Sequence, residues 1–274
     1  MIQKYIQYLS SIRNYSRNTC CSYEKDLVAF SKWAKAHLED ARWSTITRAD
    51  IDKYVCYMVE TGLKPATTNR RLSAISGLYS YMKREGLEVE NPCKYECRRK
   101  ISRSIPNTIN ADELKRAYEN AKGVTRLFLG ILSTTGVRLQ ELLDLSWEDI
   151  DFSESSLKIN GKGAKQRIVY TTSEVLDELS RVKELIKPQG RMFRITQRDA
   201  RHMIWEALRP YCHSKQLSPH AIRHTFATNL AKHGANVSQL GTLLGHEHLE
   251  TTQKYIDMSQ HNNKEIVQQY SLFN

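Results

Sequence analysis

The 274-residue sequence lacks the long apolar runs and biased tracts that would assign it to a membrane or low-complexity class. No run approaches the ~20 apolar residues that a membrane-spanning helix needs. The N-terminus alternates polar and apolar residues where a signal peptide would carry an apolar block. We find no internal repeat. The chain is therefore expected to be a globular cytoplasmic protein without membrane contact, long enough for two domains.

Cysteine pairs are also missing. The six cysteines include no Cys-x-x-Cys pair, and Cys93 and Cys97 have no second pair at ligand spacing. His220 and His224 are four residues apart, but no glutamate lies between them as in the metalloprotease pattern, and Arg223 would repel a cation. The sequence predicts free thiols, no metal and no cofactor.

Positive charge is what the sequence has in excess. The formal net charge is +11 and the isoelectric point is near 9.3. Basic residues outnumber acidic ones in both halves of the chain. This balance predicts a polyanionic partner, and its spread favours nucleic acid held by two domains.

Apolar residues at helical spacing predict four helices in residues 1–90. Ser16 is the expected N-cap of the second helix, and Thr47 with Asp50 resembles a capping box before the third. Residues 91–107 begin with an Asn-Pro break and carry several basic residues with little apolar periodicity. We interpret this stretch as a basic interdomain linker that could lie across phosphates.

The periodicity changes in residues 108–274. Asn110 is the expected cap of the first helix there, and residues 157–159 and 167–170 are predicted strands of a β-hairpin around an Asn-Gly-Lys-Gly turn. Helical patterns return from residue 174 to the end. The chain is thus predicted to be mainly α, with two domains and a small antiparallel sheet in the second.

Several residues of the second domain could act on a phosphate. Arg138 is expected in the first turn of a helix, with Glu141 on the same face to orient it. Ser218 and Pro219 are typical of a helix start, and His220 and Arg223 follow on one face. Each feature alone could be structural.

Taken together, these residues resemble the tyrosine recombinase (phage integrase) family, in its compact Xer-type form. Five stretches follow that family's order: its first arginine box at 135–142, its lysine-bearing hairpin at 160–167, its His-x-x-Arg box at 220–228, its last histidine at 244–246 and its nucleophile at 251–255. Residues 16–30 and 68–75 resemble its N-terminal domain. The resemblance covers nearly the whole chain.

This resemblance implies a domain plan. Residues 1–90 would form a four-helix, SAM-like core-binding domain, 91–107 the linker, and 108–274 the catalytic domain, ending in an exchange helix at 264–274 that passes to a neighbouring subunit. The implied partners are double-stranded DNA with a specific recombination site and three further protomers in a tetramer. The expected DNA-binding residues of the first domain and linker are Arg70, Arg71, Arg98, Arg99 and Lys100.

The resemblance also implies a reaction. Tyr255 would attack the DNA backbone and hold the 3′-phosphate, a role suited to a phenol, which is both nucleophile and leaving group. Arg138, Arg223 and His246 would bind the phosphate oxygens, and Glu141 would orient Arg138. Lys162 would act as general acid, and His220 would assist in removing the tyrosine proton. Two alternatives are a type IB topoisomerase-like DNA-relaxing enzyme and a non-catalytic DNA-binding protein of the same fold.

Overall fold

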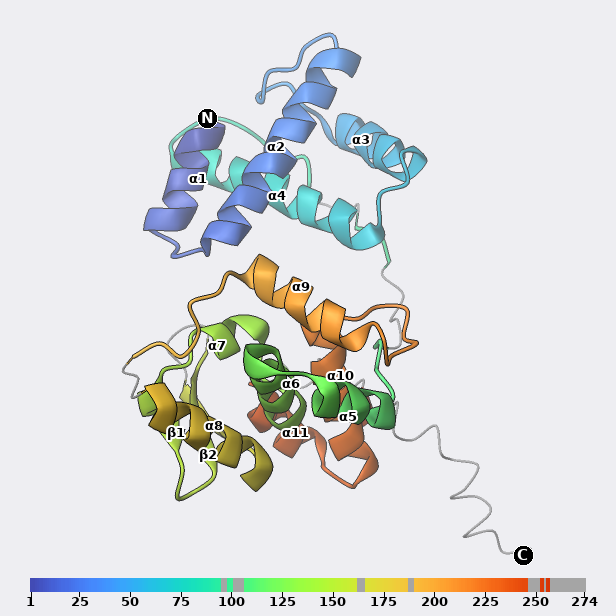
Figure 1. Ribbon diagram of the computed structural model, residues 1–274. Coiled ribbons are helices and arrows are strands. Elements are labelled where there is room, and N and C mark those ends of the chain that lie inside the picture. The colour runs from blue at the N-terminus through green and yellow to red at the C-terminus, as the bar shows by residue number, and fades with distance from the viewer. Residues whose placement is uncertain are drawn as a thin grey trace, which may run out of the picture. The chain divides into compact units, whose positions relative to one another are not determined.

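The computed structural model describes residues 1–94, 98–100, 106–161, 166–186, 190–245, 252–253 and 255–256. It divides the chain into two compact units, Met1–Arg103 and Ser104–Asn274. Within the described residues the fold is mainly helical with one small sheet, which confirms the predicted fold class (Figure 1). None of the described helices is both long and apolar enough to cross a bilayer.

The first unit is built from helices, two of which begin at N-cap residues predicted from the sequence. They are α1 (Ile2–Ser11), α2 (Arg17–His37), α3 (Arg48–Glu60) and α4 (Pro65–Arg84). The Ser16 hydroxyl accepts the Thr19 amide at 3.2 Å, and Thr47 and Asp50 form a reciprocal capping box. Both predicted caps are confirmed, and each satisfies amides that the helix itself leaves unpaired.

Aromatic side chains fill the core of this unit. The Phe30 ring lies 5.0 Å from Tyr54, and the Trp33 ring lies 4.8 Å from the same tyrosine, measured between centroids. Leu27, Ile51 and Leu78 are fully buried around them. Because each large ring removes about 150–250 Å² from water, this cluster joins α2 and α3 with few residues.

The second unit combines helices with a three-stranded antiparallel sheet. Its elements are α5 (Ala111–Asn120), α6 (Gly123–Thr135), α7 (Leu139–Leu143), the 3-10 turn η1 (Trp147–Asp149), β1 (Ile150–Asp151), β2 (Ser156–Asn160), β3 (Gln166–Tyr170), α8 (Ser173–Ile186), α9 (Gln197–Leu208), α10 (Pro219–Lys232) and α11 (Val237–Leu244). The strand order is β1-β2-β3, with Leu157 opposite Val169 and Ile159 opposite Arg167. The predicted hairpin is confirmed, and the short β1 extends it.

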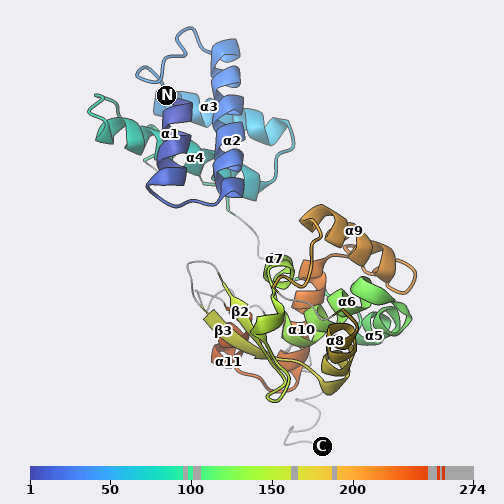
Figure 2. The same ribbon diagram turned by 60° about the vertical axis from the view of Figure 1, so that its left-hand side comes forward.

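Helix α6 is the buried centre of the second unit (Figure 1). Every residue from Leu127 to Leu132 is buried, and α5, α8, α9 and α10 pack around it. Helix α10 begins where Ser218 accepts the Ala221 amide, as predicted. Helix α11 contacts α10 and lies beside β3 (Figure 2). This packing brings the end of α6, the start of α7, and parts of α10, α11 and β3 together.

Candidate active site

Two helices of the second unit end at glycines in the left-handed conformation. Gly136 ends α6 with φ +61°, and Gly245 ends α11 with φ +62°. A side chain at Gly136 would overlap the Phe226 ring, and a Cβ at Gly245 would lie 3.0 Å from Arg167 Nη1. Both positions therefore require glycine for backbone conformation and for space.

Three arginines bind the carbonyl end of α11, by which we mean the backbone oxygens of residues 243–245. The bonds are Arg167 Nε to Leu243 O at 2.9 Å, Arg223 Nη2 to Leu244 O at 2.6 Å, and Arg138 Nη2 to Gly245 O at 3.2 Å. Arg223 also donates to Gly136 O at 2.6 Å. The last carbonyls of a helix have no partner within it and lie at the negative end of its dipole, so guanidinium groups are suited to them.

Glu141 links two of these arginines. Its carboxylate accepts both the side chain and the backbone amide of Arg138, at 2.9 and 2.8 Å. Arg167 donates to the same carboxylate through Nη1 and Nη2, at 3.0 and 2.7 Å. The side chains of Glu141 and Arg167 are only 7% and 10% exposed, whereas that of Arg138 is 40% exposed. The buried pair is fully hydrogen-bonded, and Arg138 stays open to solvent.

The electrostatics of the cluster follow from this geometry. Burial raises the pKa of Glu141, but the hydrogen bonds from Arg167 and the Arg138 amide, with the charges of both arginines, outweigh it and leave the pKa below its usual value. Burial, reinforced by the charge of Arg138, lowers the pKa of Arg223 to about 10. Glu141 is therefore an anion and Arg223 a cation at neutral pH.

Tyr255 lies against α10 and is 1% exposed. Its hydroxyl is 2.8 Å from His224 Nδ1, and the ring belongs to an apolar cluster with Ala227, Leu240 and Leu244. Burial raises the pKa of Tyr255, although the positive charge of Arg223 acts against that rise. The phenol is therefore neutral in this arrangement and needs a base to become a nucleophile.

The structure brings Arg138, Glu141 and Arg223 together and places Tyr255 within reach of their charge. Arg138 is the N-cap of α7, one residue before the helix, so the prediction that it lies in the first turn is wrong: its backbone is extended (ψ 150°). His220 is exposed and lines an open hollow of about 360 Å³ beside Trp205. Lys162, His246 and the segment 264–274 lie outside the described residues.

Two residues of this site were not assigned a role from the sequence. His224 shares a predicted helix face with His220 and Arg223, but from the sequence it was considered only as a possible metal ligand. Arg167 lies on β3, beside the turn in which the family resemblance assigns the catalytic role to Lys162. Its signal is a cation at an inward strand position, opposite the buried Ile159.

The arginines predicted to bind DNA from the first unit are partly occupied within the protein. Arg70 and Arg71 both pair with the buried Asp26, and Arg71 also donates to Tyr54 Oη at 3.0 Å. The Asn69 side chain bonds the backbone amide and carbonyl of Arg99, at 2.8 and 2.9 Å. Its neighbours Arg98 and Lys100 are exposed.

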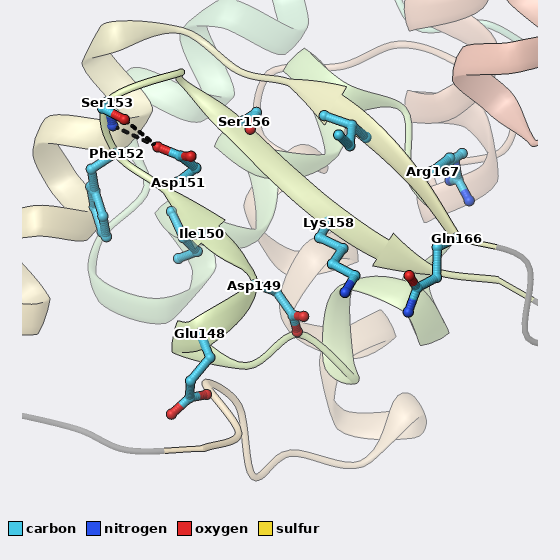
Figure 3. Close-up of a pocket in the computed structure, with 11 residues that line it drawn as sticks. Glu148, Asp149, Ile150, Asp151, Phe152, Ser153, Ser156, Lys158, Gln166 and Arg167 are labelled. Carbon is cyan, nitrogen blue, oxygen red and sulfur yellow. Dashed lines mark hydrogen bonds between the residues drawn. The ribbon is translucent and has the colours of Figure 1, made fainter.

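A second open hollow, of about 810 Å³, lies on the outer face of the sheet (Figure 3). Lys158 and Gln166 project from that face, with Glu148 and Asp149 below them, and Arg167 also borders the hollow (Figure 3). Acidic and basic side chains both line this hollow, so it is not suited to binding an anion. Among the described residues no group of three His, Cys, Asp or Glu side chains could hold a metal ion.

Comparison with known families matches both units. Residues 107–262 match the phage integrase family, and residues 2–86 match the phage integrase N-terminal SAM-like domain. The chain is 30% identical to a tyrosine recombinase XerD from Oceanobacillus iheyensis, over 98% of this chain and 97% of that protein. It is 28% identical to a tyrosine recombinase XerC from Listeria monocytogenes, over 92% and 91% of the two chains.

Solved structures share the fold. A XerH site-specific recombinase bound to a palindromic difH substrate superposes with a TM-score of 0.75 at 20% identity, covering 97% of this chain and 84% of that one. A lambda integrase dimer bound to a COC′ core site gives 0.70 at 18% identity, covering 93% and 75%.

The fold and these matches define an enzyme that breaks and rejoins DNA strands with a tyrosine. The chain belongs to the phage integrase family of tyrosine recombinases and is a site-specific DNA recombinase. The topoisomerase and non-catalytic alternatives are not favoured by these relatives.

The depressed pKa of Glu141 makes its contribution to stability depend on pH. A carboxylate with a lowered folded-state pKa stabilises the protein above its unfolded value of 4.5, and the effect is lost as the pH falls through the folded-state pKa. Glu141→Gln should lower the free energy of unfolding by roughly 3 kcal/mol at neutral pH, because Arg167 then stays buried without an anion. Urea unfolding should show this difference narrowing below pH 4.5.

Asp144→Asn is the matched control. Its ion pair with Arg191 is largely exposed, so the loss should be below about 1 kcal/mol. If Glu141→Gln lowers the free energy of unfolding by the same amount down to strongly acidic pH, Glu141 is not the stabilising anion described here.

Proposed function

We propose that this recombinase cleaves DNA through a 3′-phosphotyrosine bond to Tyr255, with Arg138 and Arg223 holding the scissile phosphate. The supporting observation is that Arg138 and Arg223 both bind the carbonyl end of α11, while Leu244 of that helix packs in the same apolar cluster as Tyr255. A phosphate bound by the two arginines would therefore lie near the nucleophile. Residues 1–90 would grip the duplex, 91–107 would link the domains, and 108–274 would carry the chemistry.

The arginines would do the work that a divalent metal does in other phosphoryl-transfer enzymes. Negative charge builds on the non-bridging oxygens as the tyrosine attacks, and a guanidinium donates two parallel N–H bonds to such oxygens. Arg138 is suited to this role because Glu141 and Gly245 hold it on one side while its side chain stays 40% exposed. His246 is proposed to donate a further hydrogen bond.

Proton transfers complete the step. The phenol must lose a proton as it attacks, and the leaving 5′-oxygen must gain one. The family resemblance assigns the tyrosine proton to His220. Because His224 Nδ1 lies 2.8 Å from Tyr255 Oη, we propose instead that His224 is the first acceptor and that His220 assists it. Lys162 is proposed to protonate the 5′-oxygen. Because the phosphotyrosine keeps the energy of the phosphodiester, rejoining needs no ATP and no cofactor.

Tyr255→Phe should abolish covalent DNA adduct formation and leave duplex binding within about twofold of the parent, because one hydroxyl is lost and no cation. The duplex is first selected from a random pool, and the cleaved bond is then mapped. Adducts are measured on denaturing gels and affinity by mobility shift. Tyr170→Phe is the control, since Tyr170 is 61% exposed on the sheet. This variant should cleave DNA at the parental rate. An adduct formed by Tyr255→Phe would show that another residue attacks.

His224→Asn should slow adduct formation by about 100-fold, a typical contribution of a positioned base. The amide can occupy the place of Nδ1 and keep a hydrogen bond to Tyr255, yet it cannot accept the proton. Single-turnover rates on a nicked suicide duplex measure the effect. His220→Asn, made in parallel, separates the two histidines of α10. Near-parental cleavage by His224→Asn would limit its role to orienting the ring.

The recombinase is further proposed to act as a tetramer on two duplexes, with segment 264–274 passed to a neighbouring protomer. Support comes from the sequence of that segment, in which Ile266, Val267, Tyr270 and Phe273 form an apolar stripe at helical spacing. Such a link would couple assembly to the placement of Tyr255.

Replacing Ile266 and Tyr270 together by serine should leave binding of one protomer to DNA unchanged, because the stripe is proposed to contact protein and not DNA. Cooperative assembly and recombination should fall at least about tenfold, as expected when a second linked contact is lost. Gln268→Ser with Gln269→Ser is the matched control in the same segment. Normal assembly by the stripe variant would remove the proposed exchange.

A further inference from the structure

Arg167 connects three separate elements of the active site. It lies on β3, its guanidinium binds Glu141 of α7, and its Nε binds the carbonyl of Leu243 in α11. We propose that Arg167 is a positioning residue, which fixes Glu141 and thereby holds Arg138 in the geometry that strand cleavage requires. This inference rests on the proposed role of Arg138 at the scissile phosphate.

The Arg167–Glu141 pair has the geometry of a rigid joint. Two nearly parallel bonds of 3.0 and 2.7 Å join the guanidinium to the two carboxylate oxygens. A fork of this kind fixes the plane of the carboxylate, which a single point charge would not do. Both side chains are buried to 10% exposure or less, so water does not compete strongly for the bonds.

Arg138 needs such support because its long side chain is 40% exposed and therefore weakly held by packing. A long arginine side chain loses rotamer entropy when it is held in one place. Glu141 holds it at two points, through Nη1 and through the backbone amide. Without Arg167, the same carboxylate could rotate about its own side chain, and the phosphate-facing group of Arg138 would shift with it.

The second anchor of Arg167 extends this joint to α11. Its Nε bond to Leu243 O fixes the guanidinium against the same helix end where Gly245 O accepts Arg138. The four groups form a closed ring: Arg167 to Glu141, Glu141 to Arg138, and both arginines to the carbonyl end of α11. Gly245 leaves room for the ring, since its missing Cβ would meet the Arg167 guanidinium at 3.0 Å.

Arg167→Gln and Arg167→Lys test this inference in the full-length protein. Both should bind the selected duplex within about twofold of the parent and form the covalent adduct roughly 10- to 100-fold more slowly, the loss expected from a small misplacement of a reacting group. Lysine keeps the positive charge beside Glu141 but lacks the fork, so it also serves as the folded variant if glutamine destabilises the domain. Lys158→Gln removes a cation from the outer face of the same sheet and should cleave normally (Figure 3).

A duplex with a neutral methylphosphonate at the scissile position separates positioning from a general structural defect. That phosphate lacks the charge that Arg138 is proposed to neutralise, so the rate deficits of Arg138→Ala and Arg167→Gln, each taken relative to the parent on the same duplex, should shrink together. A deficit caused by loss of fold would be the same on both duplexes. The double variant Arg138→Ala with Arg167→Gln should be no slower than Arg138→Ala alone, since Arg167 acts through Arg138.

Three outcomes would overturn the inference, and they are distinguishable. If both Arg167 variants cleave within about twofold of the parent while Arg138→Ala is slow, Arg167 is not a positioning residue and the role of Arg138 stands. If the rate deficit of Arg167→Gln persists on the methylphosphonate duplex, Arg167 acts by another route. The same follows if the double variant is slower than Arg138→Ala alone. If Arg138→Ala cleaves normally, the proposed phosphate site itself is wrong.

Discussion

The active site depends on how the last carbonyls of α11 are satisfied. A helix leaves its final carbonyls without internal partners, and in a buried place each unpaired carbonyl is costly. Here three arginines from three distant parts of the chain supply the bonds to residues 243–245. The same contacts that complete a helix of eight residues therefore assemble the cationic groups of the site.

The charge balance of this cluster prepares it for a phosphate. Arg138 and Arg167 both bind the carboxylate of Glu141, whereas Arg223 binds only backbone carbonyls, which offer partial negative charge. The arginines in the cluster therefore repel one another: burial and the positive charge of Arg138 together lower the pKa of Arg223. A phosphate bound beside Arg138, as proposed, would relieve that repulsion. The donors are already oriented when it arrives, which is the condition for electrostatic catalysis without reorganisation.

The sequence predicted the features that depend on local signals. Helix caps such as Ser16 and Ser218, and the hairpin strands, follow from a few adjacent residues, and they form as expected. Arg167 shows why other features were not predictable. Its strand reads Gln-Arg-Ile-Val-Tyr, in which Ile168 is the obvious candidate for the core, yet Ile168 is 57% exposed and the arginine points inward. The groups that draw it inward, Glu141 and the Leu243 carbonyl, lie 26 and 76 residues away. Only the packing of α7 and α11 against the sheet reveals them.

Tyr255, the proposed nucleophile, is buried in the free protein. A DNA phosphate can reach only a hydroxyl that solvent can reach, and this residue is 1% exposed. Withdrawing an aromatic side chain of 150–250 Å² from its apolar cluster costs on the order of 4–6 kcal/mol at about 25 cal/mol per Å². Since each 1.4 kcal/mol is a factor of ten, roughly one molecule in a thousand or fewer would present its nucleophile at any moment. If Tyr255 attacks DNA as proposed, that population would by itself limit cleavage by protein that is not assembled on a recombination site.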